Sequence, residues 1–375
     1  MKKFKFFGMA AIAAMAVSCS SDDVVTQVQD DNAIQFGTYV GKAAISRGTV
    51  ATIDNVEAGF GVFAYYTGTT AFASYTGTTP NFMNNEKVYS VDDGATWKYD
   101  ITKYWPNNND EMVSFFAYAP YDEDYVASAN GKVTYQVPAD VTEQRDLLWS
   151  RSNTTDLKKQ AVDGVVTFNF AHALARVGVT VSCAIDAANA PETGAIADGT
   201  TIKVNKIVFS SKNDVTTAGP APEPTTEGAF YTQGVIDMNA TSDVAYGNDV
   251  WSEKTGAQTI ALDVDNFKGD LTFDKLDNAK DENDDDSYMM VIPQDFSTGG
   301  LYVWVDYTVT TTDGKLADGK SVIENKISQA VPVNLLQGKA YTLNLVLGMT
   351  SVKVKASIDE WELVDAAQVD VPANN

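Results

Sequence analysis

Alternation of apolar and polar side chains with a period of two residues restricts the fold of this chain more than any other feature. In "LYVWVDYTV" every second residue from Leu301 to Val309 is apolar, and "IQFGTYV", "YTLNLVL" and "SVKVKASI" alternate in the same way. Because a strand places successive side chains on opposite faces, this pattern predicts half-buried β-strands. No segment of a dozen residues carries an apolar stripe of helical period, so the sequence predicts an all-β fold.

Turn-forming clusters such as "PNNND" and "ASANG" separate the short expected strands, which is typical of β-sandwiches. The polar stretch "RSNTTDLKKQAVDG" divides two β-rich blocks, so we expect domains at residues 33–157 and 158–375. In "VVTFNFAHALARVGVTV" the apolar residues change from even positions, such as Phe168, to odd positions, such as Val177. A strand cannot change its buried face without an irregularity, and we expect a bulge or a break within "AHALA".

The beginning of the chain has the layout of an export signal. "MKKFKFF" is basic and "GMAAIAAMAV" is apolar, so residues 1–18 are predicted to be a signal peptide. Cys19 follows small residues in "AVSC", which is typical of a lipidated cysteine, although Ala16 stands where leucine is usual. Residues 19–32 are polar and acidic and predict a flexible tether. The alternative is ordinary secretory cleavage that leaves a spare cysteine.

Charge and cysteine content limit the partners and the chemistry. The formal net charge is −23, and loss of the three lysines of the signal peptide makes it −26. So acidic a surface repels nucleic acid and anionic lipid headgroups, and we expect neither as a partner. After Cys19 only Cys183 remains, so we expect no disulfide within the mature chain and a fold that depends on its apolar core.

Residues capable of catalysis or metal binding are sparse. His172 is the only histidine and lies in the apolar "FAHALA", so a hydrogen-bonded structural histidine is favoured over a catalytic or zinc-binding one. Cys183 is expected to pack as a small apolar residue. The acidic run at residues 281–287 is interpreted as a solvated loop, with a calcium site as the alternative. We therefore predict no catalytic site, no metal site, no cofactor and no enzyme activity.

Several motifs resemble those of one family. "WKYDITKYWPNNNDEMVSFFAYAP", "DLLWS", "FNFAHALARVGVTV", "YMMVIPQ" and "GKAYTLNLVLGMTSVKVKASIDEW" are similar, in the same order, to the landmarks of the fimbrillins, the type V pilins and their relatives. The resemblance implies two transthyretin-like β-sandwich domains in tandem, with Greek-key connections. It also implies a lipoprotein that reaches the outer membrane and is then built into a fimbrium.

In the family that these motifs resemble, an arginine-specific protease cuts after the first strand, and a neighbouring subunit supplies a replacement strand. The resemblance points to cleavage between Arg47 and Gly48, after the expected strand at residues 34–40. The alternative is that Arg47 is merely an exposed loop residue. The candidate donor strand is a C-terminal segment whose apolar residues fall on alternate positions. These residues are Trp361, Leu363, Ala367, Val369 and Val371. Asp365 interrupts that series, and the tail could instead pair within its own domain.

Two hypotheses of function follow. The first is a structural fimbrial subunit, stalk or tip, that serves cell adhesion and assembles by donor-strand exchange. Its partners would be other fimbrial subunits, the protease and a receptor on a host or bacterial surface. The second is a permanently lipid-anchored surface protein that does not polymerise and that anchors a fimbrium or binds a glycan or host ligand.

Overall fold

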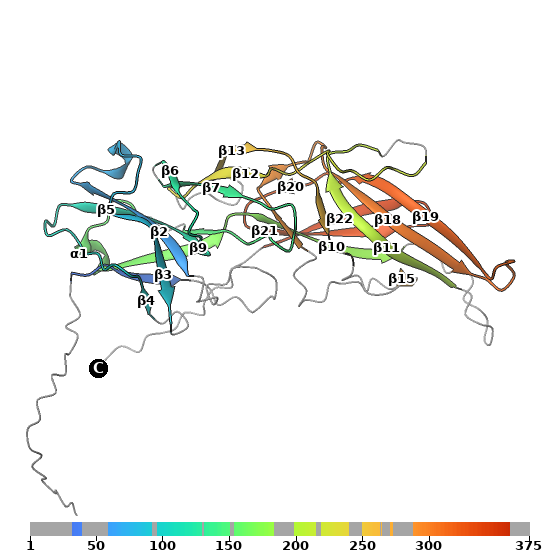
Figure 1. Cartoon of the computed structure of the whole chain (residues 1–375), viewed down its shortest axis with the longest axis horizontal. Helices are drawn as coiled ribbons and strands as arrows, with labels where there is room; N and C mark the ends of the chain where they lie inside the picture. Colours follow the sequence, from blue (N-terminus) through green and yellow to red (C-terminus); the bar gives the residue numbers. More distant parts are fainter. Residues whose placement is uncertain are drawn as a thin grey trace, which may run out of the picture.

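The computed structural model describes residues 32–39, 59–91, 96–129, 131–150, 154–183, 199–214, 219–239, 250–262, 264, 271–272 and 288–360. Within these ranges the chain forms packed β-sheets along one elongated body (Figure 1). Helical structure is limited there to the 3-10 turn η1 (Phe72–Ser74) and the α-helix α1 (Lys159–Val162), neither of which is long and apolar enough to cross a membrane. The predicted all-β fold class is confirmed. The two transthyretin-like sandwiches in tandem stay a prediction.

The N-terminal half is built around a seven-stranded sheet. In order across the sheet, its strands are β1 (Gln35–Tyr39), β9 (Val165–His172), β8 (Leu148–Ser150), β5 (Met112–Ala119), β2 (Phe60–Gly68), β3 (Met83–Ser90) and β4 (Trp97–Lys98). The sequence of β5 is an almost continuous apolar run because its two faces enter two different cores. Phe115 and Ala117 enter one core, whereas Phe116 and Tyr118 enter the other.

The two cores lie on opposite faces of this sheet. The sheet itself encloses one of them, because its end strands β1 and β4 lie beside each other and Ala33 forms a bridge with Tyr104. A four-stranded sheet covers the other core and contributes Tyr135 and Trp251 to it. In order, the strands of that sheet are β13 (Trp251–Thr255), β12 (Gln233–Asp237), β7 (Lys132–Gln136) and β6 (Ala127–Ala129).

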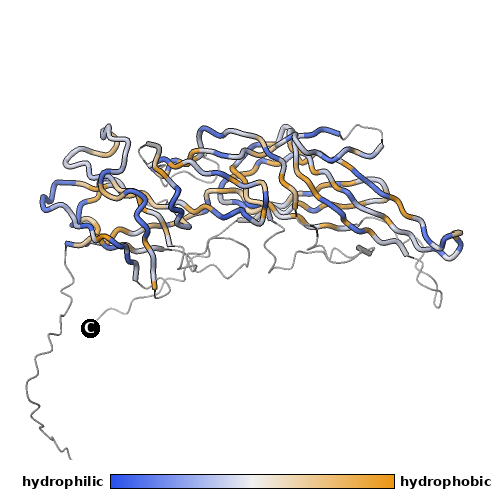
Figure 2. Tube along the Cα trace, in the orientation of Figure 1, coloured by the Kyte–Doolittle hydropathy of each residue, from blue (hydrophilic) through white to orange (hydrophobic). Residues whose placement is uncertain are grey.

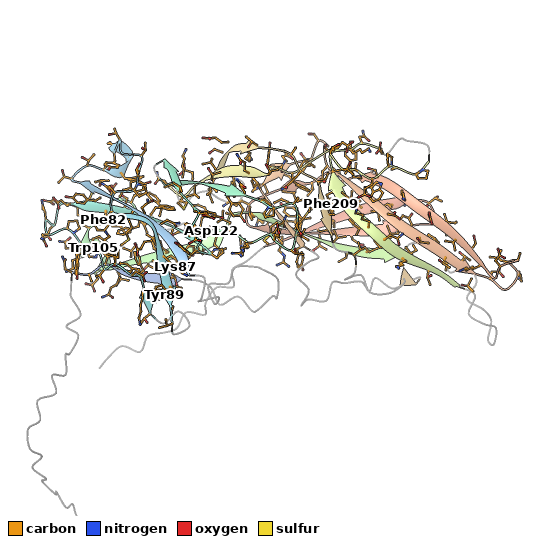
Figure 3. The ribbon with its side chains drawn as sticks, in the orientation of Figure 1. Phe82, Lys87, Tyr89, Trp105, Asp122 and Phe209 are labelled. Atoms are coloured by element: carbon orange, nitrogen blue, oxygen red, sulfur yellow. The ribbon has the colours of Figure 1, made fainter. Side chains whose placement is uncertain are left out.

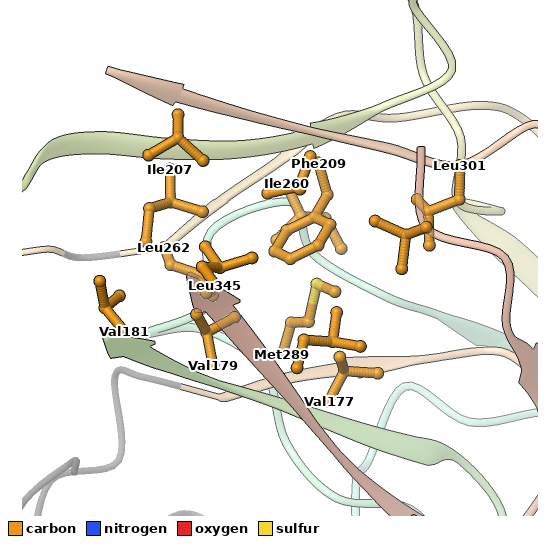
Figure 4. Packing of buried hydrophobic residues seen from close by; sticks show 14 of the residues in the cluster. Val177, Val179, Val181, Ile207, Phe209, Ile260, Leu262, Met289, Leu301 and Leu345 are labelled. Carbon is orange, nitrogen blue, oxygen red and sulfur yellow. The ribbon is translucent and has the colours of Figure 1, made fainter. Parts of the chain in front are cut away.

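The C-terminal half is a sandwich of two sheets whose facing side chains form a third core (Figure 4). One sheet contains β16 (Tyr288–Val291), β10 (Ala175–Cys183), β21 (Lys339–Leu347) and β22 (Val352–Glu360). The other contains β14 (Ile260–Leu262), β11 (Gly199–Ser210), β18 (Tyr302–Thr312) and β19 (Lys320–Ala330). The short strand β15 (Leu271–Thr272) also pairs with β11, and β17 (Gln294–Asp295) pairs with β20 (Asn334–Leu335).

The alternation of apolar and polar residues in the sequence matches the burial of side chains in the C-terminal sandwich. Val303 and Val305 of β18, and Leu343 and Leu345 of β21, are fully buried, as their parity predicts. Hydrophobic and hydrophilic residues follow one another along these strands (Figure 2). The two-residue period therefore identified the inward-facing positions correctly.

The chain passes from one half to the other between β9 and β10. β9 ends at His172 and β10 begins at Ala175, so the predicted break within "AHALA" is confirmed. The division into domains at residues 33–157 and 158–375 stays a prediction, but the strand pairing crosses it. β9 pairs with β8 and β1, and β12 returns to pair with β7. The N-terminal half therefore contains strands from both predicted domains, whereas the strands of the C-terminal sandwich all come from the second.

Candidate functional site

The first strand, β1, is an edge strand of the seven-stranded sheet. It runs parallel to β9, its one sheet neighbour among the described strands, with Gln35 opposite Val165. Ile34, which directly precedes β1, and Phe36 point inward and are only 2% and 6% exposed. Thr38, which has the same parity, is half-buried, and Val40 lies outside the described residues. We call residues 32–39 the ribbon. Its side chains Ile34 and Phe36 fill two apolar pockets, which together we call the β1 slot.

Aromatic rings form the pocket that holds Phe36. The Phe36 ring stacks on Phe168, with ring centroids 5.7 Å apart, and its contacts with Tyr99 and Phe115 are edge-on at 5.4 and 6.0 Å. Phe60 closes the pocket at 6.3 Å. Burial of a phenylalanine contributes about 1.5–3 kcal/mol, and each aromatic pair adds about 0.5–1.5 kcal/mol. Phe36 is therefore the main side-chain anchor of β1.

A second segment, residues 99–105, holds the ribbon on the side away from β9, and we call it the clamp. The Ile34 N–H donates to the carbonyl of Lys103 at 2.8 Å, and the Ile34 carbonyl accepts from the Tyr99 hydroxyl at 2.8 Å. The Trp105 N–H donates to the carbonyl of Asn32 at 2.9 Å, and the Asn32 side chain donates back to the carbonyl of Trp105 at 3.0 Å. Figure 3 labels Trp105 at this end of the molecule. The ribbon is therefore bonded along both of its edges.

The clamp was missed by sequence reasoning. The aromatic run "YDITKYW" is the local signal for it, but the contacts depend on a chain reversal that brings residues 99–105 back to residue 34. Burial raises the pKa of Tyr99 above its ordinary value of 10.0; Glu86 and Tyr104 act in the same direction, and a hydrogen bond from the Lys103 N–H opposes them. Tyr99 therefore stays protonated at neutral pH and can keep donating to the ribbon.

The other predicted site residues lie outside the described residues. These are Cys19, Arg47, Gly48, the acidic segment 281–287, and the donor candidates Trp361, Leu363, Ala367, Val369 and Val371. In the sequence, Arg47 falls between the end of β1 at Tyr39 and the start of β2 at Phe60. A cut after Arg47 would therefore break the covalent link between β1 and every later strand.

His172 makes the hydrogen bond that its sequence context predicts. Its Nδ1 lies 2.6 Å from Oδ2 of Asp146, and the two side chains are 2% and 0% exposed. Nearby, the Trp251 indole N–H donates to the carbonyl of Ala173 at 2.7 Å. These contacts surround the passage from β9 to β10, so the histidine belongs to the joint between the two halves. Within the described ranges, no three histidine, cysteine, aspartate or glutamate residues are grouped so that they could hold a metal ion.

Comparisons with known proteins place the chain in a family. It matches the profile of the fimbrillin-like family over residues 47–361. It is 25% identical to the fimbrium subunit Fim1C of Phocaeicola vulgatus, in an alignment that covers 94% of this chain and 95% of that protein. A crystal structure of a fimbrial protein from Bacteroides vulgatus has the same fold, with a TM-score of 0.62 and 23% identity over 88% of this chain and 100% of that one. The chain belongs to the fimbrillin-like family, and the resemblance found in its motifs is confirmed.

Proposed function

We propose that this chain is a structural subunit of a fimbrium, stalk or tip, that assembles when a neighbouring subunit replaces its first strand. In this proposal Cys19 is lipidated and carries the precursor to the outer membrane. An arginine-specific protease then cuts between Arg47 and Gly48, and the mature subunit passes into the fimbrium. Family membership and the similarity to a fimbrium subunit support the assignment.

One observation carries the proposal: the ribbon that a cut after Arg47 would detach lies at the edge of a sheet and fills two apolar pockets. Ile34 and Phe36 are buried, and hydrogen bonds join the ribbon to β9 and to the clamp. Loss of the ribbon would leave unpaired backbone groups on β9 and an aromatic pocket open to water. Such an edge accepts an added strand, because main-chain hydrogen bonds give affinity and the side-chain pockets give register.

The C-terminal segment fits this role by its spacing. Trp361 and Leu363 lie two positions apart, with one residue between them, as Ile34 and Phe36 do. Inserted parallel to β9, in the register of β1, they would place the indole in the Ile34 pocket and the leucine in the Phe36 pocket, and the chain would continue along β9. Ala367, Val369 and Val371 have the same parity and would extend the contact. Burial of four or five such side chains contributes on the order of 6–12 kcal/mol before the cost of ordering the strand.

The proposal is tested on the purified chain with an arginine-specific protease. We expect a mature N-terminus at Gly48 by mass spectrometry, followed by polymers visible by electron microscopy. Arg47→Ala should remain uncut and monomeric, whereas Arg151→Ala, which changes a later arginine, should be processed normally. Polymers formed equally well by Arg47→Ala would contradict the proteolytic step. A surface protein that keeps Cys19 and its acyl chains on cells would favour the permanently anchored alternative.

A further inference from the structure

A pocket of about 570 Å³ opens on the N-terminal half, and no residue of the β1 slot lines it. Its volume lies within the range of about 300–1,000 Å³ that is usual for small-molecule sites. Figure 3 labels Asp122, one of its residues. The lining residues are Asp122, Asp124, Tyr125, Val126, Thr134 and Gln136.

The pocket arises because β6 is shorter than β7. β6 pairs only with Lys132 and Val133 of β7, and no described strand pairs with residues 134–136 on that side. Alternation along β7 turns Tyr135 into the core and leaves Thr134 and Gln136 exposed on the outer face. The segment 122–126, which leads into β6, forms the facing wall. The polar side chains of β7 are therefore presented to a concave space.

Hydrogen bonds fix the facing wall. The Asp122 carbonyl accepts from the Tyr118 hydroxyl and from the Asn85 side chain, both at 2.8 Å, and its carboxylate accepts from the Asp124 N–H at 2.9 Å. The Tyr118 ring lies against Tyr125, with ring centroids 4.9 Å apart. Gly61 permits this position of Tyr118, because a Cβ at residue 61 would lie 2.3 Å from the tyrosine ring. The wall is thus ordered before any ligand arrives, which reduces the entropic cost of binding.

We propose that this pocket binds a neutral carbohydrate. Its carboxylates, amide and hydroxyl supply the acceptors and donors that neighbouring sugar hydroxyls require, and Gln136 can offer both at once. Tyr125 and Val126 supply apolar surface for the C–H face of a sugar ring. None of the described residues that line the pocket is lysine or arginine, and the chain carries a net charge of −23, so a sialylated or sulfated sugar is repelled. The site is independent of the proposed strand exchange.

The probes are lactose, maltose and cellobiose as neutral sugars, sialyllactose as an anionic one, and spermidine as a cation. Saturation-transfer NMR on the full chain should show transfer to at least one neutral sugar at millimolar concentration and none to sialyllactose. Absence of transfer to all three neutral sugars would overturn the proposal. So would sialyllactose binding as strong as that of the neutral sugars, or spermidine displacing a bound sugar, because the latter would make the pocket a cation site.

Two single substitutions test whether the sugar binds in this pocket. Thr134 and Gln136 are exposed, so Gln136→Ala and Thr134→Ala should leave the fold intact. Each is expected to weaken sugar binding about fivefold, the effect of one lost hydrogen bond. The matched control is Gln160→Ala, an exposed glutamine of α1 that lines no part of this pocket. Equal affinity in Gln136→Ala, Thr134→Ala and the control would overturn the assignment of the sugar to this pocket.

Discussion

The edge strands β1 and β22 are stabilised in different ways. β1 has five residues, pairs in parallel, and is anchored by Phe36 in a pocket of four aromatic rings. β22 has nine residues and pairs with β21 along its whole length, from Val352 opposite Leu347 to Glu360 opposite Lys339. Its side chains contribute less, because Val352 is buried whereas Ile358 is 57% exposed. β1 combines backbone hydrogen bonds with deep side-chain anchors, whereas β22 has a long backbone ladder and fewer buried side chains.

The difference indicates which edge another strand can take over. A short strand with two deep anchors leaves defined pockets, and these give register to an incoming strand. β22 instead presents Lys353 and Lys355 to solvent, and exposed lysines on an edge strand discourage further pairing. The N-terminal edge therefore offers the pockets that the proposed strand exchange requires, whereas the C-terminal edge carries lysines that oppose it.

The largest effect is expected at the joint that connects the two sheets carrying these edges. Asp146→Ala leaves His172 buried beside an empty position and should lower the free energy of unfolding by about 3–5 kcal/mol. Urea unfolding measures the change. Asp140→Ala, which removes an exposed carboxylate bonded only locally to Thr142 in the described contacts, is the control. Equal effects of the two variants would show that the joint contributes nothing beyond a surface residue.

Phe36→Ala tests the anchor of β1 directly. Removing a buried phenyl ring should destabilise the precursor by about 3 kcal/mol, because the aromatic pocket cannot collapse around an alanine. A loss below about 0.5 kcal/mol in the precursor, the range of ordinary surface changes, would mean that β1 is not held by its side chains.

Tyr99→Phe removes the hydroxyl that donates to the Ile34 carbonyl and should cost about 1 kcal/mol at neutral pH. The raised pKa of Tyr99 adds stability that is fully present below the unfolded value of about 10 and is lost as the pH rises above it. The stability difference between wild type and Tyr99→Phe should therefore shrink above pH 10. A difference that grows with pH in that range would contradict the assigned role.

Ile358→Ala should have the smallest effect, within about 0.5 kcal/mol, because the side chain is mostly exposed and the backbone ladder of β22 is unchanged. The thermal unfolding midpoint, compared with that of Phe36→Ala, measures the contrast between the two edges. An Ile358→Ala midpoint as low as that of Phe36→Ala would remove the distinction between them.

Sequence patterns predicted the parts of the structure that depend on local alternation. The inward-facing residues of β18 and β21, the break after His172 and the burial of Ile34 and Phe36 all follow from the two-residue period. β22 shows the limit of this reasoning, since Ile358 has the parity of Val352 but is 57% exposed. Whether a residue has an odd or even position determines the face of the strand on which its side chain lies, but not what packs against that face.

Long-range contacts could not be predicted in the same way. The parallel pairing of β1 with β9 joins residues about 130 positions apart, and the clamp brings Lys103 and Trp105 back to the ribbon. The pocket beside Gln136 depends on the different lengths of β6 and β7, which no alternation reveals. The proposed cleavage and donor residues rest on the family resemblance, and Arg47 and Trp361 lie outside the described residues.

Hydrogen–deuterium exchange of the β9 backbone tests most directly whether the β1 slot is emptied and refilled. In the intact precursor the amides of Val166 and Phe168 should be protected, because these are the β9 N–H groups that face β1. After the cut at Arg47 and removal of the first strand they should exchange rapidly, and in the polymer they should be protected again. Protection that persists after the strand has been removed, or polymers that still contain the first strand, would contradict the account.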